Sequence, residues 1–318
     1  MKKLIFMALT VAVLFNPVNA LAKDPIKVTN AKSFKNSQSV VIGSFSIGFL
    51  VSKTDQATTG KRGYGGSASI AHSTLEGVNS NDLQAITDAA YADFTAKLTA
   101  AGYEIVDHAR LVTDPAMAKI KYQPSGIEAG VTFGKDSKAR ALFFGPTAFG
   151  AQPLMEGESG AGLLSGFGAF GPAMAKNTYA IKNKQPILNV SYIVDFASAD
   201  RYGGAFAMGT SVTVKSQLAI ADTLSKVTVT DTKGILGTAE LVDPIVVAGA
   251  FGDFQDSTSH GEKTGNTVGN LMGALMGGGS SSRKSLTFTA SPDQYRLGAI
   301  NAAERANAAF LQTIQQLR

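Results

Sequence analysis

The residue types that most often carry catalysis are few in this chain, and none stands in a recognised spacing. The three histidines, His72, His108 and His260, lack the HExxH spacing of a zinc-binding helix. Ser165 lacks the leading glycine of a hydrolase nucleophile elbow. The GEKTG sequence at 261–265 lacks the first half of a phosphate-binding loop. We therefore expect no catalytic residue, no metal site and no cofactor, and a protein that is not an enzyme.

Two glycine-rich apolar segments, residues 139–175 and 261–282, are the other unusual feature. Pro146, Pro153 and Pro172 in the first segment predict that no long helix forms there. The segment then either folds over on its own domain or presents an apolar surface to a membrane or a neighbouring subunit. The side chains expected on such a contact surface are Phe143, Phe144, Phe149, Leu163, Leu164, Phe167 and Phe170.

The elements that would support these segments begin with two amphipathic helices. In residues 79–102 the apolar side chains recur every three or four positions, with Ser80 or Asn81 as N-cap and Gly102 as the stop. Residues 291–317 repeat the pattern, and Asn307 is the one polar break in the inner stripe. On the first helix we expect the solvent-facing side chains to be Asp88, Asp93 and Lys97.

Several segments alternate apolar and polar residues or are rich in β-branched side chains, as is typical of strands. The chain between residues 52 and 79 instead predicts a long loop or an excursion containing one strand. The expected fold class is α+β or α/β, with a mixed sheet, two helices packed on it and the two glycine-rich excursions. The predicted strands are 40–51, 66–75, 103–106, 185–197, 211–221, 226–232 and 240–250.

The first 22 residues have the pattern of a secretory signal peptide. Lys2 and Lys3 precede an apolar run that is too short to span a bilayer, and a small-residue cleavage pattern ends at Ala22. The chain has no cysteine, and removing the two lysines lowers its net charge of +5 by two, which does not favour nucleic acid. We expect one exported domain, residues 23–318, with insertions at 139–175 and 261–282. Its expected location is the periplasm, and association with the outer membrane is a further option.

A glycine-rich excursion, an alanine-rich helix ending at Gly102 and then the sequence YEIVD give the chain a family resemblance. This order resembles the N-terminal α/β unit of the curli secretion channel family and related periplasmic domains. The turn at Asp231 to Gly234 and the closing helix are similar in order. The lipid-bearing cysteine of the channel subunits is absent, so the resemblance implies a lipid-free, envelope-associated relative.

Three functions compete. The leading hypothesis is a non-catalytic exported protein that binds or helps assemble a cell-envelope complex. Its partner would be an envelope protein or the outer-membrane surface, with a homo-oligomer as a further option. The first alternative is an oligomeric outer-membrane ring or pore subunit. The second is an exported hydrolase, which would need Ser73 brought to His72 or His108 and an acid.

Overall fold

The computed structural model describes residues 25–35, 38–59, 66–153, 163–204, 207, 209–275 and 281–317, so the expected signal peptide lies outside the described residues. The main helices are α1 (Ser80–Ala100), α3 (Leu163–Asn183), α4 (His260–Leu275) and α5 (Pro292–Gln316), with a single turn at α2 (Ala109–Val112). Short 3-10 turns occur at η1 (Ala31–Phe34), η2 (Pro115–Met117) and η3 (Thr147–Phe149). The strands are β1 (Ile26–Thr29), β2 (Ser39–Thr58), β3 (Ala68–Glu76), β4 (Glu104–Val106), β5 (Tyr122–Gln123), β6 (Ile127–Thr132), β7 (Ser137–Phe144), β8 (Gln152–Pro153), β9 (Ile187–Tyr202), β10 (Ser211–Ile220), β11 (Lys226–Thr230), β12 (Leu236–Leu241), β13 (Ile245–Val247), β14 (Gly252–Asp256) and β15 (Ser281–Ala290).

One mixed sheet organises the fold, which is therefore of the α+β class. Its strand order is β1-β12-β11-β9-β2-β3-β15-β14. The pairs β2–β9 and β15–β3 are parallel, whereas β2–β3, β11–β9 and β14–β15 are antiparallel. Strand β7 pairs with β2 and β6, and β10 pairs with β9 and the short edge strand β13.

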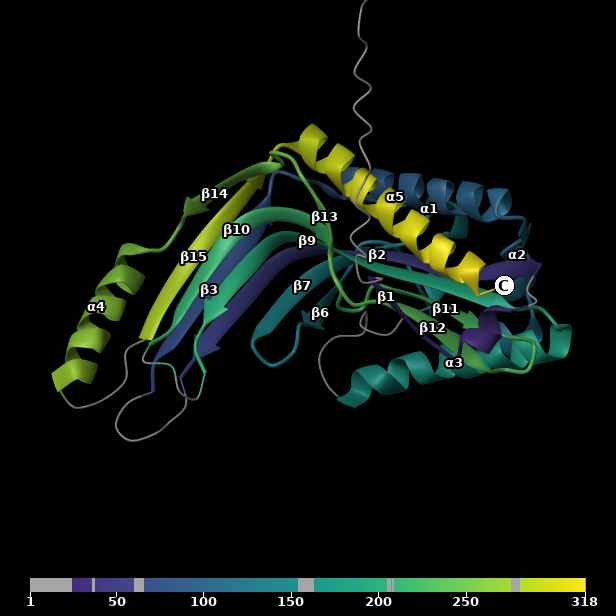
Figure 1. Cartoon of the computed structure of the whole chain (residues 1–318), viewed down its shortest axis with the longest axis horizontal. Coiled ribbons are helices and arrows are strands. Elements are labelled where there is room, and N and C mark those ends of the chain that lie inside the picture. Colours follow the sequence, from purple (N-terminus) through teal and green to yellow (C-terminus); the bar gives the residue numbers. More distant parts are fainter. Residues whose placement is uncertain are drawn as a thin grey trace, which may run out of the picture.

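The helices divide between the two faces of the sheet (Figure 1). Helices α1 and α5 pack side by side on one face, and α3 runs along the opposite face. The larger hydrophobic core lies beneath α1 and α5 and contains Phe45, Phe94, Tyr192 and Phe310. A smaller core beneath α3 contains Ala175, Tyr179 and Ile187. The expected pair of amphipathic helices on a shared sheet is confirmed.

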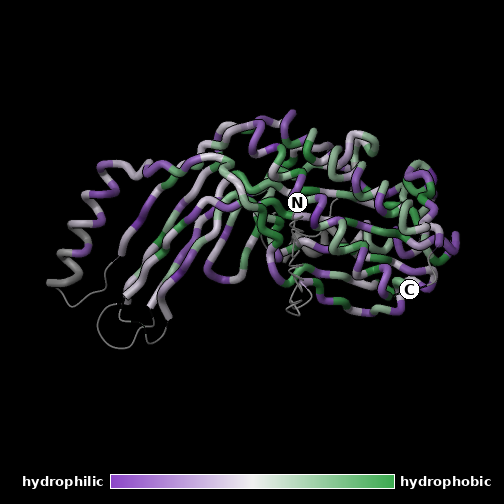
Figure 2. The backbone as a smooth tube through the Cα atoms, turned by 45° about the horizontal axis from the view of Figure 1, so that its top comes forward, coloured by the Kyte–Doolittle hydropathy of each residue, from purple (hydrophilic) through white to green (hydrophobic). Residues whose placement is uncertain are grey.

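The outer parts of β2, β3, β9, β10 and β15 extend past the helices as an arm, with α4 at its far end (Figure 1). Figure 2 shows hydrophobic segments concentrated in the body, whereas the outer arm is mostly hydrophilic or intermediate. Inside the arm, the Ser69 hydroxyl bonds with the hydroxyl groups of Thr210 and Ser282, at 2.9 and 3.2 Å. Small polar side chains therefore take part in holding the arm together.

Several sequence expectations differ from the structure. Strand β2 continues to Thr58, where a loop was expected from residue 52, because antiparallel pairing with β3 gives its backbone groups partners. The single strand expected at 240–250 is divided between β12 and β13, and Pro244 lies in the break. The N-cap of α1 is Asn79, which forms a capping box with Asp82.

The two expected insertions also contain regular elements. Residues 139–144 belong to β7 beside β2, so they are part of the main sheet. Helix α3 continues through Pro172, contrary to the prediction that proline would prevent a long helix. Proline removes one helical hydrogen bond, but here the following turns are held by burial of Ala175, Tyr179 and Ala180 against the sheet.

Candidate functional site

The structure separates the residues that a serine hydrolase would need. Ser73 and His72 are neighbours on β3, so their side chains point to opposite faces, and the Ser73 hydroxyl is buried while His72 is exposed. The His72 ring bonds instead with the Thr54 hydroxyl at 3.0 Å. His108 bonds through Nδ1 to the Ile42 carbonyl oxygen at 2.8 Å. Ile42 lies eleven residues before Lys53, which pairs with Ser73, and this is roughly 35 Å along the strand. The structure therefore does not bring together the residues that the hydrolase alternative requires.

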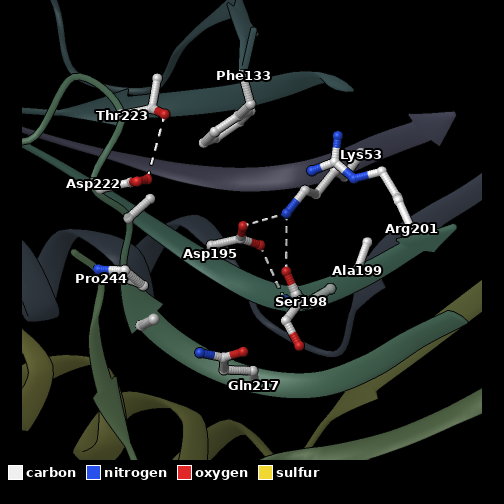
Figure 3. Close-up of a pocket in the computed structure, with 13 residues that line it drawn as sticks. Lys53, Phe133, Asp195, Ser198, Ala199, Arg201, Gln217, Asp222, Thr223 and Pro244 are labelled. Carbon is white, nitrogen blue, oxygen red and sulfur yellow. Dashed lines mark hydrogen bonds and ion pairs between the residues drawn. The ribbon is translucent and has the colours of Figure 1, made fainter. Parts of the chain in front are cut away.

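A cavity of about 330 Å³ lies between β2, β9, β10 and the β6–β7 turn (Figure 3). Lys53 projects into it from β2, and Asp195 and Arg201 come from β9. Phe133 covers one side, with its ring centroid 5.2 Å from the Lys53 ammonium nitrogen. Further lining residues are Ala197, Ser198, Ala199, Gln217, Ala219, Ala221, Asp222, Thr223 and Pro244.

The centre of this cavity is a buried ion pair. Lys53 Nζ donates to Asp195 Oδ2 at 2.5 Å and to the Ala197 carbonyl oxygen at 3.0 Å. Burial raises the pKa of the Asp195 carboxyl, and the positive charge of Lys53 partly offsets that effect. The pairing of β2 with β9 ends at Phe49 and Val194, and the ion pair links the two strands just beyond that point. Both charges are buried, and each compensates the other.

A second acid lies next to this pair. Asp55 is 1% exposed, and neither of its carboxylate oxygens accepts a hydrogen bond from the described residues. Its nearest cation is Arg201, with Nη2 3.7 Å from Asp55 Oδ1. Arg201 also lines a second cavity of about 420 Å³, together with Gln56, Lys135 and Asp136. Two cations and two acids, Lys53, Arg201, Asp195 and Asp55, therefore lie close together in the arm.

The sequence analysis did not select Lys53, Asp195 or Arg201. One signal was present, because Lys53 and Asp55 are two residues apart and so share one face of β2. Asp195 is likewise the one acid within residues 187–197, the buried part of β9. No local rule indicates that these two strands bring their charges together, since β2 and β9 are far apart in the chain.

The residues expected on a contact surface have three different environments. Phe143 and Phe144 on β7 are both buried in the main core, so the contact-surface prediction is wrong for them. Neighbouring side chains of a strand point to opposite faces, so β7 is covered on both faces at this point. Phe149 is half-buried and stacks on the His108 ring at 4.0 Å. Leu163, Leu164, Phe167 and Phe170 lie in α3, and their side chains are outside the described part of the structure.

An exposed apolar patch nevertheless occurs on the same helix. Met174 and Ile181 of α3 are 51% and 43% exposed, and Ile235 and Leu236 at the β11–β12 turn are 49% and 52% exposed. The turn packs directly on the helix, because a Cβ added at Gly234 would lie 2.8 Å from Ile181 Cδ1. We call these four residues the α3 patch.

Among the described residues, no group of three or more histidine, cysteine, aspartate or glutamate side chains is arranged to hold a metal ion. No helix in the same part of the chain is both long and apolar enough to cross a membrane. Comparison of the chain with protein-family models, with curated proteins and with solved structures finds no match.

Proposed function

We propose that this chain is a non-catalytic, exported protein that binds or helps assemble a complex of the cell envelope. The observation that carries the proposal is the α3 patch, in which Ile181 and, two helical turns before it, Met174 are exposed on a helix that contacts the turn bearing the exposed Ile235 and Leu236. Exposed apolar side chains that gather in one place mark interaction surfaces more often than singly scattered ones do.

The packing beneath the patch supports this function. Ala175, Tyr179 and Ala180 on the inner face of α3 are buried, so the helix is already fixed to the sheet without Met174 and Ile181. Tyr179 and Ala180 are buried and the next residue, Ile181, is exposed. One side of α3 therefore packs on the sheet, and another faces solvent. The outward side chains are thus free to bury their surface against an envelope partner.

Crosslinking in the native envelope tests the proposal. A photoreactive amino acid at position 181 should give a discrete crosslinked product that fractionates with the envelope. The matched control is position 297 on α5, because Leu297 is also apolar and is 61% exposed but lies outside the α3 patch. Equal crosslinking from both positions, or none from position 181, would contradict the assignment of the patch as a contact surface.

The hydrolase alternative loses the pairing of Ser73 with histidine on which it depended. The ring or pore subunit stays a prediction from the sequence.

A further inference from the structure

Helix α3 divides into an uncharged part and a basic end. Its residues 163–175 include no charged side chain, whereas Lys182 lies in its last turn and Lys184 directly follows the helix. The helix runs along the face of the sheet opposite α1 and α5, at an outer boundary of the molecule (Figure 1). Helices that lie in a membrane interface combine an apolar face with neighbouring lysine or arginine side chains.

Three exposed lysines lie close to Ile181 in the α3 patch. Lys182 and Lys184 follow Ile181, and Lys233 precedes Gly234 and Ile235 in the β11–β12 turn. Because Gly234 contacts Ile181, these lysines come together near Ile181 from two elements that are far apart in the sequence.

The acids nearest these lysines are engaged in local structure. Asp114 accepts hydrogen bonds from the Ala116 backbone N–H at 2.8 Å and from Asn183 Nδ2 at 3.2 Å, and Lys182 Nζ is 3.9 Å away. Asp231 Oδ1 accepts from the backbone N–H groups of Lys233 and Ile235, both at 2.8 Å. These carboxylates stabilise turns and Asp114 also pairs with Lys182, whereas Lys184 and Lys233 form no ion pair with a described residue.

We propose that the α3 patch docks on an anionic lipid surface, with its four apolar side chains in the interface and its lysines against phosphate headgroups. This inference rests on the proposed function and names the partner of the same surface. Lysines beside exposed apolar side chains match a bilayer, which presents negative headgroups above hydrocarbon over its whole area. A protein partner would instead need an acid placed opposite each lysine. The vesicle experiment distinguishes a lipid surface from such a protein partner.

Vesicle sedimentation of the purified mature chain tests the inference. The probes are vesicles of phosphatidylethanolamine with phosphatidylglycerol, and neutral vesicles of phosphatidylcholine. We expect binding to the anionic vesicles that weakens as salt is added, and much weaker binding to the neutral ones. Changing Lys182, Lys184 and Lys233 together to Gln should weaken binding on the order of 100-fold, at about five-fold for each lysine.

Two controls separate a specific surface from general attraction. The first changes the exposed lysines Lys135, Lys138 and Lys284 to Gln, which removes the same charge at positions outside the patch and should leave binding near the native value. The second is Leu297→Ser, to be compared with Ile181→Ser. Only Ile181→Ser should reduce binding, because only that side chain enters the interface.

Each outcome decides the proposal. Loss of binding confined to the patch variants supports it. Absence of binding to anionic vesicles, or an equal loss in the control lysine variant, overturns it. If vesicles are not bound but position 181 crosslinks to an envelope protein, the lipid inference fails and the proposed function stands. If neither vesicles nor an envelope protein is contacted, both fail.

Discussion

Asn307 on α5 donates a hydrogen bond from Nδ2 to the Asp93 carboxylate on α1, at 2.8 Å. The same amide donates to the Ala90 carbonyl oxygen at 2.9 Å, and its Oδ1 accepts from the Tyr192 hydroxyl at 2.8 Å. Asn307 is fully buried, so this single side chain connects both helices to β9 of the sheet. A polar group inside a core is stable only when its partners are present, as they are here.

Replacing Asn307 with Leu should therefore lower the free energy of unfolding by about 2–4 kcal/mol, because Tyr192 and Asp93 lose a buried partner. Asn301→Leu is the matched control, since Asn301 lies on the same helix and is exposed. Denaturant titration of both variants measures the effect. Equal midpoints for the two variants would show that the buried network does not stabilise the fold.

Phe94→Ala on α1 should cost about 3–5 kcal/mol, because the ring is fully buried against Phe45. Asp93→Ala should cost about 1–2 kcal/mol, since the carboxylate accepts from Asn307 and pairs with Lys97. The exposed Thr99→Ala should lie within about 0.5 kcal/mol of the native protein. A cost for Asp93→Ala as small as that of Thr99→Ala would mean that its contact with Asn307 contributes no stability.

Removing one partner of the Lys53–Asp195 ion pair should destabilise the fold more than replacing both partners with apolar residues. Lys53→Met leaves Asp195 as a buried unpaired acid and should lower the free energy of unfolding by about 3–5 kcal/mol. The double variant Lys53→Met, Asp195→Leu should recover most of that loss, because no isolated charge remains. A double variant no more stable than Lys53→Met alone would contradict this account of the pair.

His108 should give the protein a pH dependence near neutrality. Burial lowers the pKa of its imidazole below 6.5, and the nearby Lys176 lowers it further, whereas the hydrogen bond to Ile42 and the charge of Asp107 oppose the shift. Below pH 6.5 the unfolded chain thus binds more protons at this residue than the folded chain does, so stability is full above that pH and falls on acidification through the lowered pKa.

The measurement is unfolding at several pH values between about 5 and 7.5, around the ordinary histidine pKa. His108→Gln should flatten the pH dependence in that range, because it removes the titrating group. An unchanged slope in this variant would assign the pH dependence to other residues.

The sequence predicted the local elements better than it predicted the site. The spacing of Leu83, Phe94 and Leu98 indicated the buried face of α1, and the positive φ of Gly102 at 83° agrees with its role as the stop. The same spacing predicted that Asp93 faces water, which is wrong, because Asn307 of α5 donates a hydrogen bond to its carboxylate. The periodicity of one helix carries no information about a second helix that packs beside it. Long-range contacts of this kind are set by the tertiary fold.

The glycine-rich segment shows the same limit. Its composition indicated an unusual apolar surface; Met174, which was not among the residues selected, is exposed within it, and the exposed Ile181 lies beyond its end. Composition did not distinguish Phe143 and Phe144, which are buried because β7 pairs with β2. It also gave no sign of Ile235 and Leu236, which come from a distant turn and complete the patch.

The most direct test of the α3 patch as a contact surface is a paired measurement on the double variant Met174→Ser, Ile181→Ser. Both side chains are largely exposed, so the thermal midpoint should stay within a few degrees of the native value. The fraction of the protein that sediments with the native envelope should fall to the background level. A variant that keeps its envelope association, or that loses it only because the midpoint collapses, would contradict the account.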